Sequence, residues 1–235
     1  ITPLIAGMIS MYLLFHRQRE LFCLPTKTDV IVKFKDGWDI FISTVFINLY
    51  TNSSIFILRI MTNDMCVGYY TAANKLIEAA KGLMAPISNA IFPHVSLLYK
   101  ESRERAILFL CKTLRIIGGV NFMGSCIIFI FAEPIVRIIM GNAYTESILI
   151  LRILSFLPFI IGLSNVFGIQ TMVVFGMQRV FSRILMLSAV LNFILIFPLI
   201  YLWEAIGLSI TVVLVECFVT VAMYVMLRVH GINLK

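Results

Sequence analysis

The stretch GYYTAANKLIEAAKGLMAPISNAIF, residues Gly68–Phe92, combines an apolar helical pattern with a stripe of polar and charged side chains. At 100° per residue these side chains fall within an arc of roughly 100°, with Lys75 at its edge. Ionisable side chains are costly at membrane depth, so a helix of this kind is expected beside an aqueous cavity inside a membrane bundle. The stripe consists of Tyr70, Thr71, Asn74, Glu78, Lys81, Ser88 and Asn89.

Further apolar stretches lie on both sides of this one. Hydrophobic residues make up 60% of the chain and charged residues 13%, which is far from the composition of a soluble domain. The stretches are continuous rather than alternating, and a helix needs about 20 residues to cross a membrane. We therefore predict an all-α, polytopic transmembrane helix bundle with about seven spans. The spans are Thr2–Phe15, Trp38–Met61, Val67–Phe92, Ala106–Phe131, Ser147–Met177, Ile184–Leu202 and Ile206–Leu227.

Lys and Arg alternate between the two sides of this predicted bundle. The loops after the first, third and fifth spans and the tail carry several, whereas the remaining loops carry at most one each. By the positive-inside rule the basic side is cytoplasmic. The C-terminus is then cytoplasmic, in a multi-pass protein of the bacterial inner membrane. Basic residues confined to short loops set topology, and we expect no nucleic-acid partner.

The charges of the polar stripe allow two interpretations. In the first, Lys75, Glu78 and Lys81 line a cavity together with Asn74 and Asn89. In the second, the three charged side chains form a local ladder of ion pairs at helical spacing, which makes the span insertable.

The span Trp38–Met61 repeats the pattern more weakly. Arg59 lies near its outer end, where it either contributes to the cavity or extends toward the interface. The amides and hydroxyls either line the cavity or make hydrogen bonds between helices. The residues that share one face are Thr44, Asn48, Thr51, Asn52 and Arg59.

Two other features bear on the bundle. Pro86, Pro158 and Pro198 are expected to interrupt their spans, because proline removes a backbone hydrogen bond. Glu216 lies mid-span, where it is protonated, paired across helices, or a proton-coupling site. No nucleotide loop, metal-binding spacing or catalytic triad pattern is present, and we expect no enzyme activity, no cofactor and no metal.

The run Val67–Leu98 resembles the polysaccharide-repeat-unit (O-antigen) flippases of the multidrug/oligosaccharidyl-lipid/polysaccharide exporter superfamily. The resemblance is carried by G-Y-Y-x-A-A-x-K at Gly68–Lys75 and by a proline, five residues and Phe-Pro at Pro86–Pro93. The stretches Ala132–Ser147 and Leu151–Val173 are also similar to that family.

This resemblance implies a fold of two six-helix lobes. Residues 1–15 would be the truncated last helix of the first lobe and residues 16–37 a basic cytoplasmic linker between the lobes. Residues 38–228 would form the second lobe and residues 229–235 a cytoplasmic tail. The chain is then expected to be a C-terminal fragment of the transporter.

The resemblance also implies an activity, the flipping of undecaprenyl-pyrophosphate-linked oligosaccharides across the cytoplasmic membrane. Lys75, Lys81 and the asparagines would contact the head group. Membrane lipids, a polysaccharide polymerase and a chain-length regulator are the further partners implied. A cation-coupled multidrug exporter of the same fold and an inactive membrane fragment are alternatives, whereas a polymerase is disfavoured because no long outer loop is present.

Overall fold

The computed structural model describes most of the chain from residue 53 onward. The chain consists of two compact units, residues 1–38 and 39–235. All helices from α3 to α9 belong to the second unit. Every regular element in the described part is a helix, which confirms the all-α expectation. The expected first helix and linker lie outside the described residues, apart from three positions of the helix, and the domain boundaries stay a prediction. The described residues are 7–8, 10, 38, 41–42, 44–48, 53–83, 85–232 and 234.

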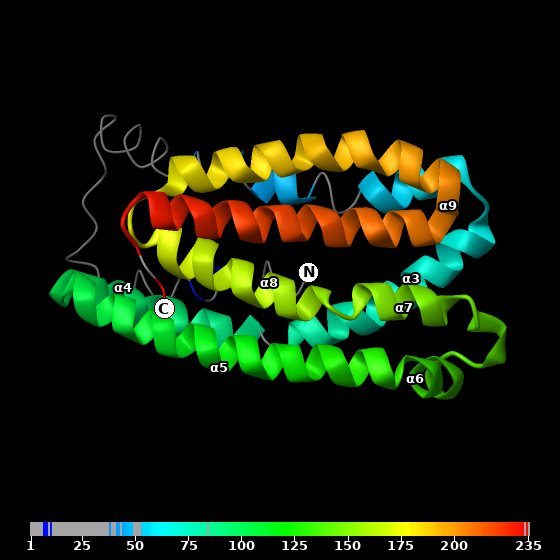
Figure 1. The fold of residues 1–235 in the computed structure, drawn as a ribbon, viewed down its shortest axis with the longest axis horizontal. Coiled ribbons are helices and arrows are strands. Elements are labelled where there is room, and N and C mark those ends of the chain that lie inside the picture. The colour runs from blue at the N-terminus through cyan, green and yellow to red at the C-terminus, as the bar shows by residue number, and fades with distance from the viewer. Residues whose placement is uncertain are drawn as a thin grey trace. The chain divides into compact units, whose positions relative to one another are not determined.

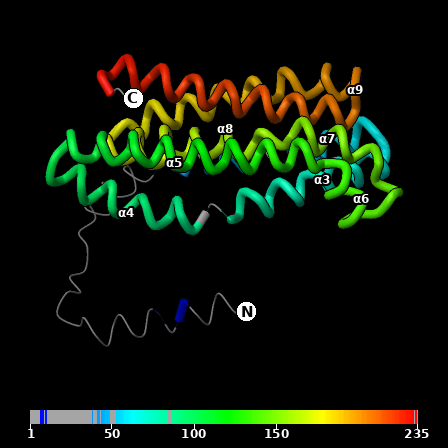
Figure 2. Tube along the Cα trace, turned by 60° about the horizontal axis from the view of Figure 1, so that its bottom comes forward, coloured from blue at the N-terminus to red at the C-terminus, as the bar shows by residue number. Residues whose placement is uncertain are grey.

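The polar stripe lies on two helices rather than one. Helix α3 spans Asp64–Gly82 and α4 spans Ala85–Glu101, so the single span predicted over this stretch was wrong. A glycine weakens the end of α3, and Pro86 suits the first turn of α4, where no backbone N–H is needed. Figure 2 shows the two helices following one another along one side of the bundle.

Helix α5, Arg103–Ile130, buries mostly small and polar residues along its length and exposes most of its large apolar residues. Asn121 and Ser125 are buried, whereas Val120 and Ile127 are 51% and 53% exposed. This is the reverse of a soluble helix and is typical of a helix whose outer face meets hydrocarbon. Ser102 caps the helix by accepting a hydrogen bond from the backbone N–H of Arg105.

The next elements form a broken span. After α6, Ala132–Ile139, and the short helix η2, Asn142–Tyr144, the chain continues as α7, Ser147–Leu154, and α8, Leu157–Asn165. Pro158 lies in the first turn of α8, which confirms the expected interruption there. Helix α8 runs directly into a π-helix, η3, at Val166–Val173.

Helix α9, Gln178–Val229, is a hairpin of two long arms. The chain reverses at Trp203 and Glu204, so the arms correspond to the last two predicted spans. Pro198 lies within the first arm, as in the predicted span Ile184–Leu202, and its effect on the course of that arm stays a prediction. At the reversal, a Cβ on Gly207 would lie 1.9 Å from the carbonyl oxygen of Leu199, so only glycine fits.

The turn of the α9 hairpin is also held by a contact with α3. Glu204 has a φ of 47°, a region that favours glycine, which costs about 1–3 kcal/mol. Its Oε2 accepts a hydrogen bond from the Cys66 Sγ at 2.9 Å. Burial, followed by the nearby Glu204 carboxylate, raises the pKa of the Cys66 thiol to about 11, so the thiol stays protonated and donating at neutral pH.

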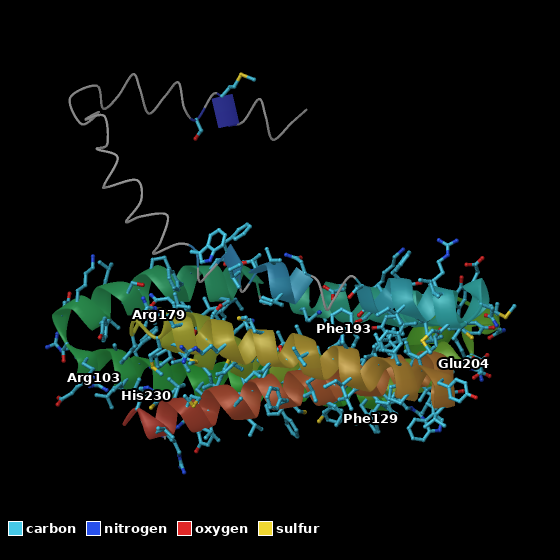
Figure 3. All side chains as sticks on the ribbon, turned by 90° about the horizontal axis from the view of Figure 1, so that it is seen from above. Arg103, Phe129, Arg179, Phe193, Glu204 and His230 are labelled. Carbon is cyan, nitrogen blue, oxygen red and sulfur yellow. The ribbon has the colours of Figure 1, made fainter. Side chains whose placement is uncertain are left out.

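These helices form layers in which α7 and α8 lie between α5 and the arms of α9 (Figure 1). Three helical segments of the described part are long and apolar enough to cross a membrane: Arg103–Ile130, Ser147–Val173 and Gln178–Val229. Figure 3 shows Arg103, Arg179 and His230 at one end of the bundle and Glu204 at the other. Two of the loops predicted to be basic and the tail therefore share one end.

Helices α5 and α8 approach closely at Gly162. A Cβ at this position would lie 2.3 Å from Nδ2 of Asn121, a side chain that is 5% exposed. The missing side chain of Gly162 therefore makes room for a buried amide.

The first prediction concerns the α9 hairpin. Gly207→Ala should lower stability by about 1–3 kcal/mol, because the new methyl group meets backbone that cannot move without opening the turn. The thermal unfolding midpoint of the purified protein in detergent measures this. Gly119→Ala is the matched control, since nothing lies within 4 Å of its Cβ position. An unchanged midpoint for Gly207→Ala would contradict the hairpin geometry.

The second prediction concerns the contact of α5 with α8. Gly162→Ala should destabilise the protein by a similar amount, and Asn121→Ala should remove most of that penalty in the double variant, because the clash is with a side chain. The same unfolding measurement on the two single variants and the double variant tests the coupling. Strictly additive effects would show that the two residues do not meet.

Candidate functional site

A cavity of about 430 Å³ lies inside the bundle, between α3, α8 and α9. Its wall is mixed, with amides and charged groups on α3 facing aliphatic side chains on α8 and α9. Asn48 and Ile55 complete it from the helical segments that precede α3. The lining residues are Asn48, Ile55, Tyr70, Asn74, Glu78, Lys81, Leu157, Ile161, Val212 and Glu216.

Four of the eight predicted site residues line this cavity. Asn74, Glu78 and Lys81 reach it from α3 at helical spacing, and Asn48 reaches it from the preceding segment. The Nδ2 of Asn48 also donates to the backbone carbonyl oxygen of Thr44 at 2.9 Å. The stripe on α3 is therefore directed toward the cavity.

Three of the other four predicted residues are not brought into the cavity wall. Lys75 and Asn89 are exposed and are not among the residues that line it. Arg59 forms an ion pair with Asp64 at 3.2 Å, and both side chains are exposed. Asn52 lies outside the described residues.

Lys81 is the charged residue placed most centrally. Its ammonium pairs with the Glu78 carboxylate one turn away on α3, and its side chain is 23% exposed. Part of the predicted ion-pair ladder is therefore present within the cavity wall, so the two interpretations of the stripe coexist. The pair leaves the ammonium available to a stronger anion, because a partly exposed ion pair of this kind stabilises by only about 1 kcal/mol or less.

Glu216 changes the charge of the cavity. It lies on the second arm of α9, is 8% exposed, and faces the same space as Glu78 and Lys81. The acidic and basic side chains in the described wall are thus two glutamates and one lysine. The position of Glu216 relative to the cavity was not predictable from the sequence, because helical periodicity within one span does not show which neighbouring span a side chain faces.

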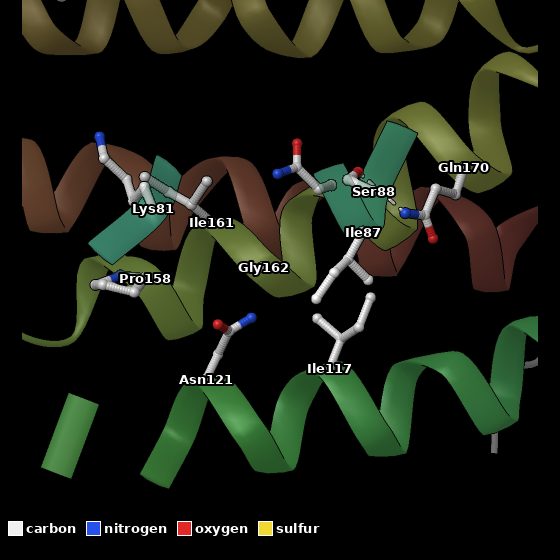
Figure 4. Close-up of a pocket in the computed structure, with 10 residues that line it drawn as sticks. Lys81, Ile87, Ser88, Ile117, Asn121, Pro158, Ile161, Gly162 and Gln170 are labelled. Atoms are coloured by element: carbon white, nitrogen blue, oxygen red, sulfur yellow. Dashed lines mark hydrogen bonds between the residues drawn. The ribbon is translucent and has the colours of Figure 1, made fainter. Parts of the chain in front are cut away.

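Two smaller cavities adjoin the central one. One of about 100 Å³ lies against α4 and α5, and one of about 230 Å³ lies against the two arms of α9. Lys81 and Ile161 line all three, so the three spaces meet at this pair. Figure 4 shows the smallest cavity, with Lys81 and Ile161 on one side of it.

Amides that sequence analysis passed over line these side cavities. Asn121 of α5 and Gln170 of η3 border the smallest cavity, and Asn165 of α8 borders both. Each is an amide within an otherwise apolar span, and that contrast was the available signal. Asn121 also shares the inner face of α5 with Gly118 and Ser125, which are buried at helical spacing.

Comparison with known proteins shows which proteins the chain is similar to. Residues 1–98 match the family model described as "Polysaccharide biosynthesis protein". No solved structure matches.

Two curated relatives share the name "Putative O-antigen transporter". One, from Escherichia coli (strain K12), is 34% identical over 225 residues, which are 96% of this chain and 54% of the relative. The other, from Shigella dysenteriae, is 29% identical over 225 residues, which are 93% of this chain and 54% of the relative. The chain thus spans about half the length of the curated relatives it matches. The resemblance to the O-antigen transporters is confirmed, since the chain is similar to two of them over almost its whole length and its residues 1–98 match the polysaccharide biosynthesis family model.

Proposed function

We propose that the whole protein flips undecaprenyl-pyrophosphate-linked oligosaccharide repeat units across the cytoplasmic membrane for surface polysaccharide synthesis. The observation that carries this proposal is the polar cavity around Lys81, enclosed by helices whose outer faces are apolar. A head group of sugars and phosphates needs a hydrated route of this kind, while its lipid tail remains in the bilayer. The names of the relatives support transport rather than catalysis.

Lys81 is the proposed contact for the pyrophosphate. Its ammonium would exchange the Glu78 carboxylate for phosphate oxygens, which carry more charge and offer more acceptors. Asn48 and Asn74 would bind sugar hydroxyls, because an amide both donates and accepts hydrogen bonds. A complete cavity also needs a wall facing these residues, which we assign to the other half of a protein of the relatives' length.

The architecture proposed for the whole protein has two lobes that rock around this cavity. Residues 38–228 would form the second lobe, with the end of the bundle that holds Arg103 and Arg179 on the cytoplasmic side. A polysaccharide polymerase and a chain-length regulator would receive the flipped repeat units. We give Lys75, Asn89 and Arg59 no contact with the head group, because they do not line the described wall, and Asn52, which lies outside the described residues, stays a prediction.

A cation-coupled multidrug exporter is the second candidate. It is favoured by one observation, that Glu78 and Glu216 outnumber Lys81 in the described wall of the cavity. Carboxylates inside a membrane cavity suit cationic drugs and coupling ions.

The test compares Lys81→Ala with Lys75→Ala. Both variants lose one lysine from α3, but only Lys81 lines the cavity, which makes Lys75→Ala the matched control. The intact gene that encodes this chain, with any upstream coding sequence, is expressed in a strain that lacks its own O-antigen transporter. We expect Lys81→Ala to reduce surface polysaccharide by roughly tenfold, as loss of a charged hydrogen bond costs about 1.5–3 kcal/mol. Lys75→Ala should stay within about twofold of wild type.

Membrane abundance of the three proteins is measured in the same cells, so that a loss of protein is not taken for a loss of transport. If both variants restored polysaccharide equally, the role of Lys81 would be wrong and the transport function would stand. If wild type restored none with several repeat-unit structures but exported a cationic dye, the exporter would replace the flippase.

A further inference from the structure

Helix α5 forms an outer layer of the bundle (Figure 1), and its outward face carries two cations among apolar side chains. Lys112 and Arg115 are both exposed, and no other exposed residue between Ala106 and Ile130 is polar. Leu108, one turn before them, is 70% exposed, and Ile116, directly after them, is 56% exposed. At 100° per residue the two cations and these two apolar residues share an arc of roughly 100°. The cations therefore interrupt a row of side chains that faces lipid.

This pair lies near one boundary of the hydrocarbon. The 28 residues of α5 make a helix of about 42 Å, roughly 12 Å longer than the hydrocarbon core of a bilayer. Ile127 and Ile130, at the end of the helix, are 53% and 66% exposed, so the hydrocarbon extends to that end. The excess length then falls at the Arg103 end, which is cytoplasmic in the orientation proposed above. Lys112 and Arg115 follow Arg103 by roughly 14 and 18 Å, in the first turns inside the boundary.

Neither cation has an anionic partner within the described part of the chain. No ion pair or hydrogen bond joins the ammonium of Lys112 or the guanidinium of Arg115 to a described residue. Arg105, nearer the start of α5, differs in this respect, because it pairs with Glu101 at 3.8 Å. A cation inside the boundary of the hydrocarbon is costly without an anion. The pair therefore indicates an anion that approaches α5 from the membrane side.

The geometry of α5 favours a phospholipid as that anion. Side chains of an α-helix tilt toward its N-terminus, so Lys112 and Arg115 reach back from the hydrocarbon toward the head groups of the nearer leaflet. Residues at i and i+3 have Cβ atoms about 5–6 Å apart, so both cations can bind one phosphate. Gly119 lies one turn further into the membrane on the same face, and nothing lies within 4 Å of its Cβ position. An acyl chain of the same lipid fits against the backbone there.

We propose that Lys112 and Arg115 bind the head group of an anionic phospholipid in the leaflet at the Arg103 end, with an acyl chain in the gap over Gly119. Anionic lipids are attracted to basic residues at a membrane surface, and the paired cations direct this attraction to one face of α5. Neither residue lines the three cavities that meet at Lys81. The site is therefore separate from the proposed transport route and does not depend on what is transported.

The test measures lipid binding by the whole protein, purified in detergent from the intact gene. The protein is titrated with phosphatidylglycerol, which is anionic, and with phosphatidylcholine, which is zwitterionic, and shifts of the unfolding midpoint give the two affinities. We expect Lys112→Gln and Arg115→Gln each to lower the preference for phosphatidylglycerol by about fivefold, and the double variant to lower it by roughly twentyfold. The reason is that each cation near the membrane surface contributes about a factor of five to the affinity.

Lys100→Gln combined with Arg103→Gln is the matched control. It removes two exposed cations from the same end of the bundle, and Arg103 lies on the opposite side of α5 from Lys112, at roughly 180°. This control should keep the preference within about twofold of wild type. Lys112→Arg combined with Arg115→Lys should also keep it, because both charges remain.

Glycerol 3-phosphate, a soluble head-group fragment, tests whether the site takes a free phosphate instead. It should leave the midpoint of wild type unchanged, because it has no acyl chains to lie over Gly119. Stabilisation by this fragment equal to that by phosphatidylglycerol would overturn the lipid site. A double variant that keeps the preference would overturn it as well, and if the double variant also unfolds more easily without lipid, the two cations contact another part of the protein. Equal losses in the double variant and the control would show attraction by net charge alone.

Discussion

Helices in a bilayer have to direct their polar side chains away from hydrocarbon, and this constraint organises the whole bundle. Placing a charged side chain at the centre of a membrane helix costs about 2.5–3.5 kcal/mol, so such residues collect on inner faces. Helix α5 follows this rule with amides and small residues inside and aliphatic residues outside. Helix α3 follows it with Asn74, Glu78 and Lys81, and the space those three line is the central cavity.

The cavities depend on places where the helices are irregular. The break after Gly82, the π-helix η3 and the reversal at Glu204 each interrupt regular hydrogen bonding. The break after Gly82 and the π-helix η3 border the cavity of about 100 Å³. The reversal at Glu204 returns the chain so that Glu216 lines the same central cavity as the polar residues of α3. Regular, straight helices would place the same side chains differently. The positions of the polar side chains in the cavities therefore depend on these breaks in the backbone.

Much of the fold was predictable because it rests on local patterns. Apolar runs predicted the helices, and the period of 3.6 residues predicted that Asn74, Glu78 and Lys81 share a face. The break in the polar stripe was not predictable, because the angles between side chains were calculated for one continuous helix through residues 83–84. Beyond that break the side chains of α4 no longer follow the helical spacing of α3. Ser88 therefore lines the cavity of about 100 Å³, whereas Asn89 is exposed. Periodicity also could not decide whether Lys75, at the edge of the stripe, lines the cavity.

Residues that act through long-range contacts were harder to predict. Nothing within the second arm of α9 shows that Glu216 lines the same cavity as Lys81, since this depends on how separate spans pack. The same holds for Asn121, whose place against α8 is permitted by Gly162, 41 positions further along the chain. Sequence patterns therefore predicted the polar face of α3, and packing decided which faces meet.

The central claim is that the polar faces enclose water while the outer faces meet lipid. It is tested most directly by cysteine accessibility in the whole protein, in membranes, after its native cysteines, which include the five of this chain, have been replaced. Asn74→Cys, in the cavity wall, should react with a small water-soluble thiol reagent at least about tenfold faster than Val120→Cys, on the outer face of α5, because a thiol ionises only where water reaches it. Equal rates, or faster reaction at residue 120, would contradict the account.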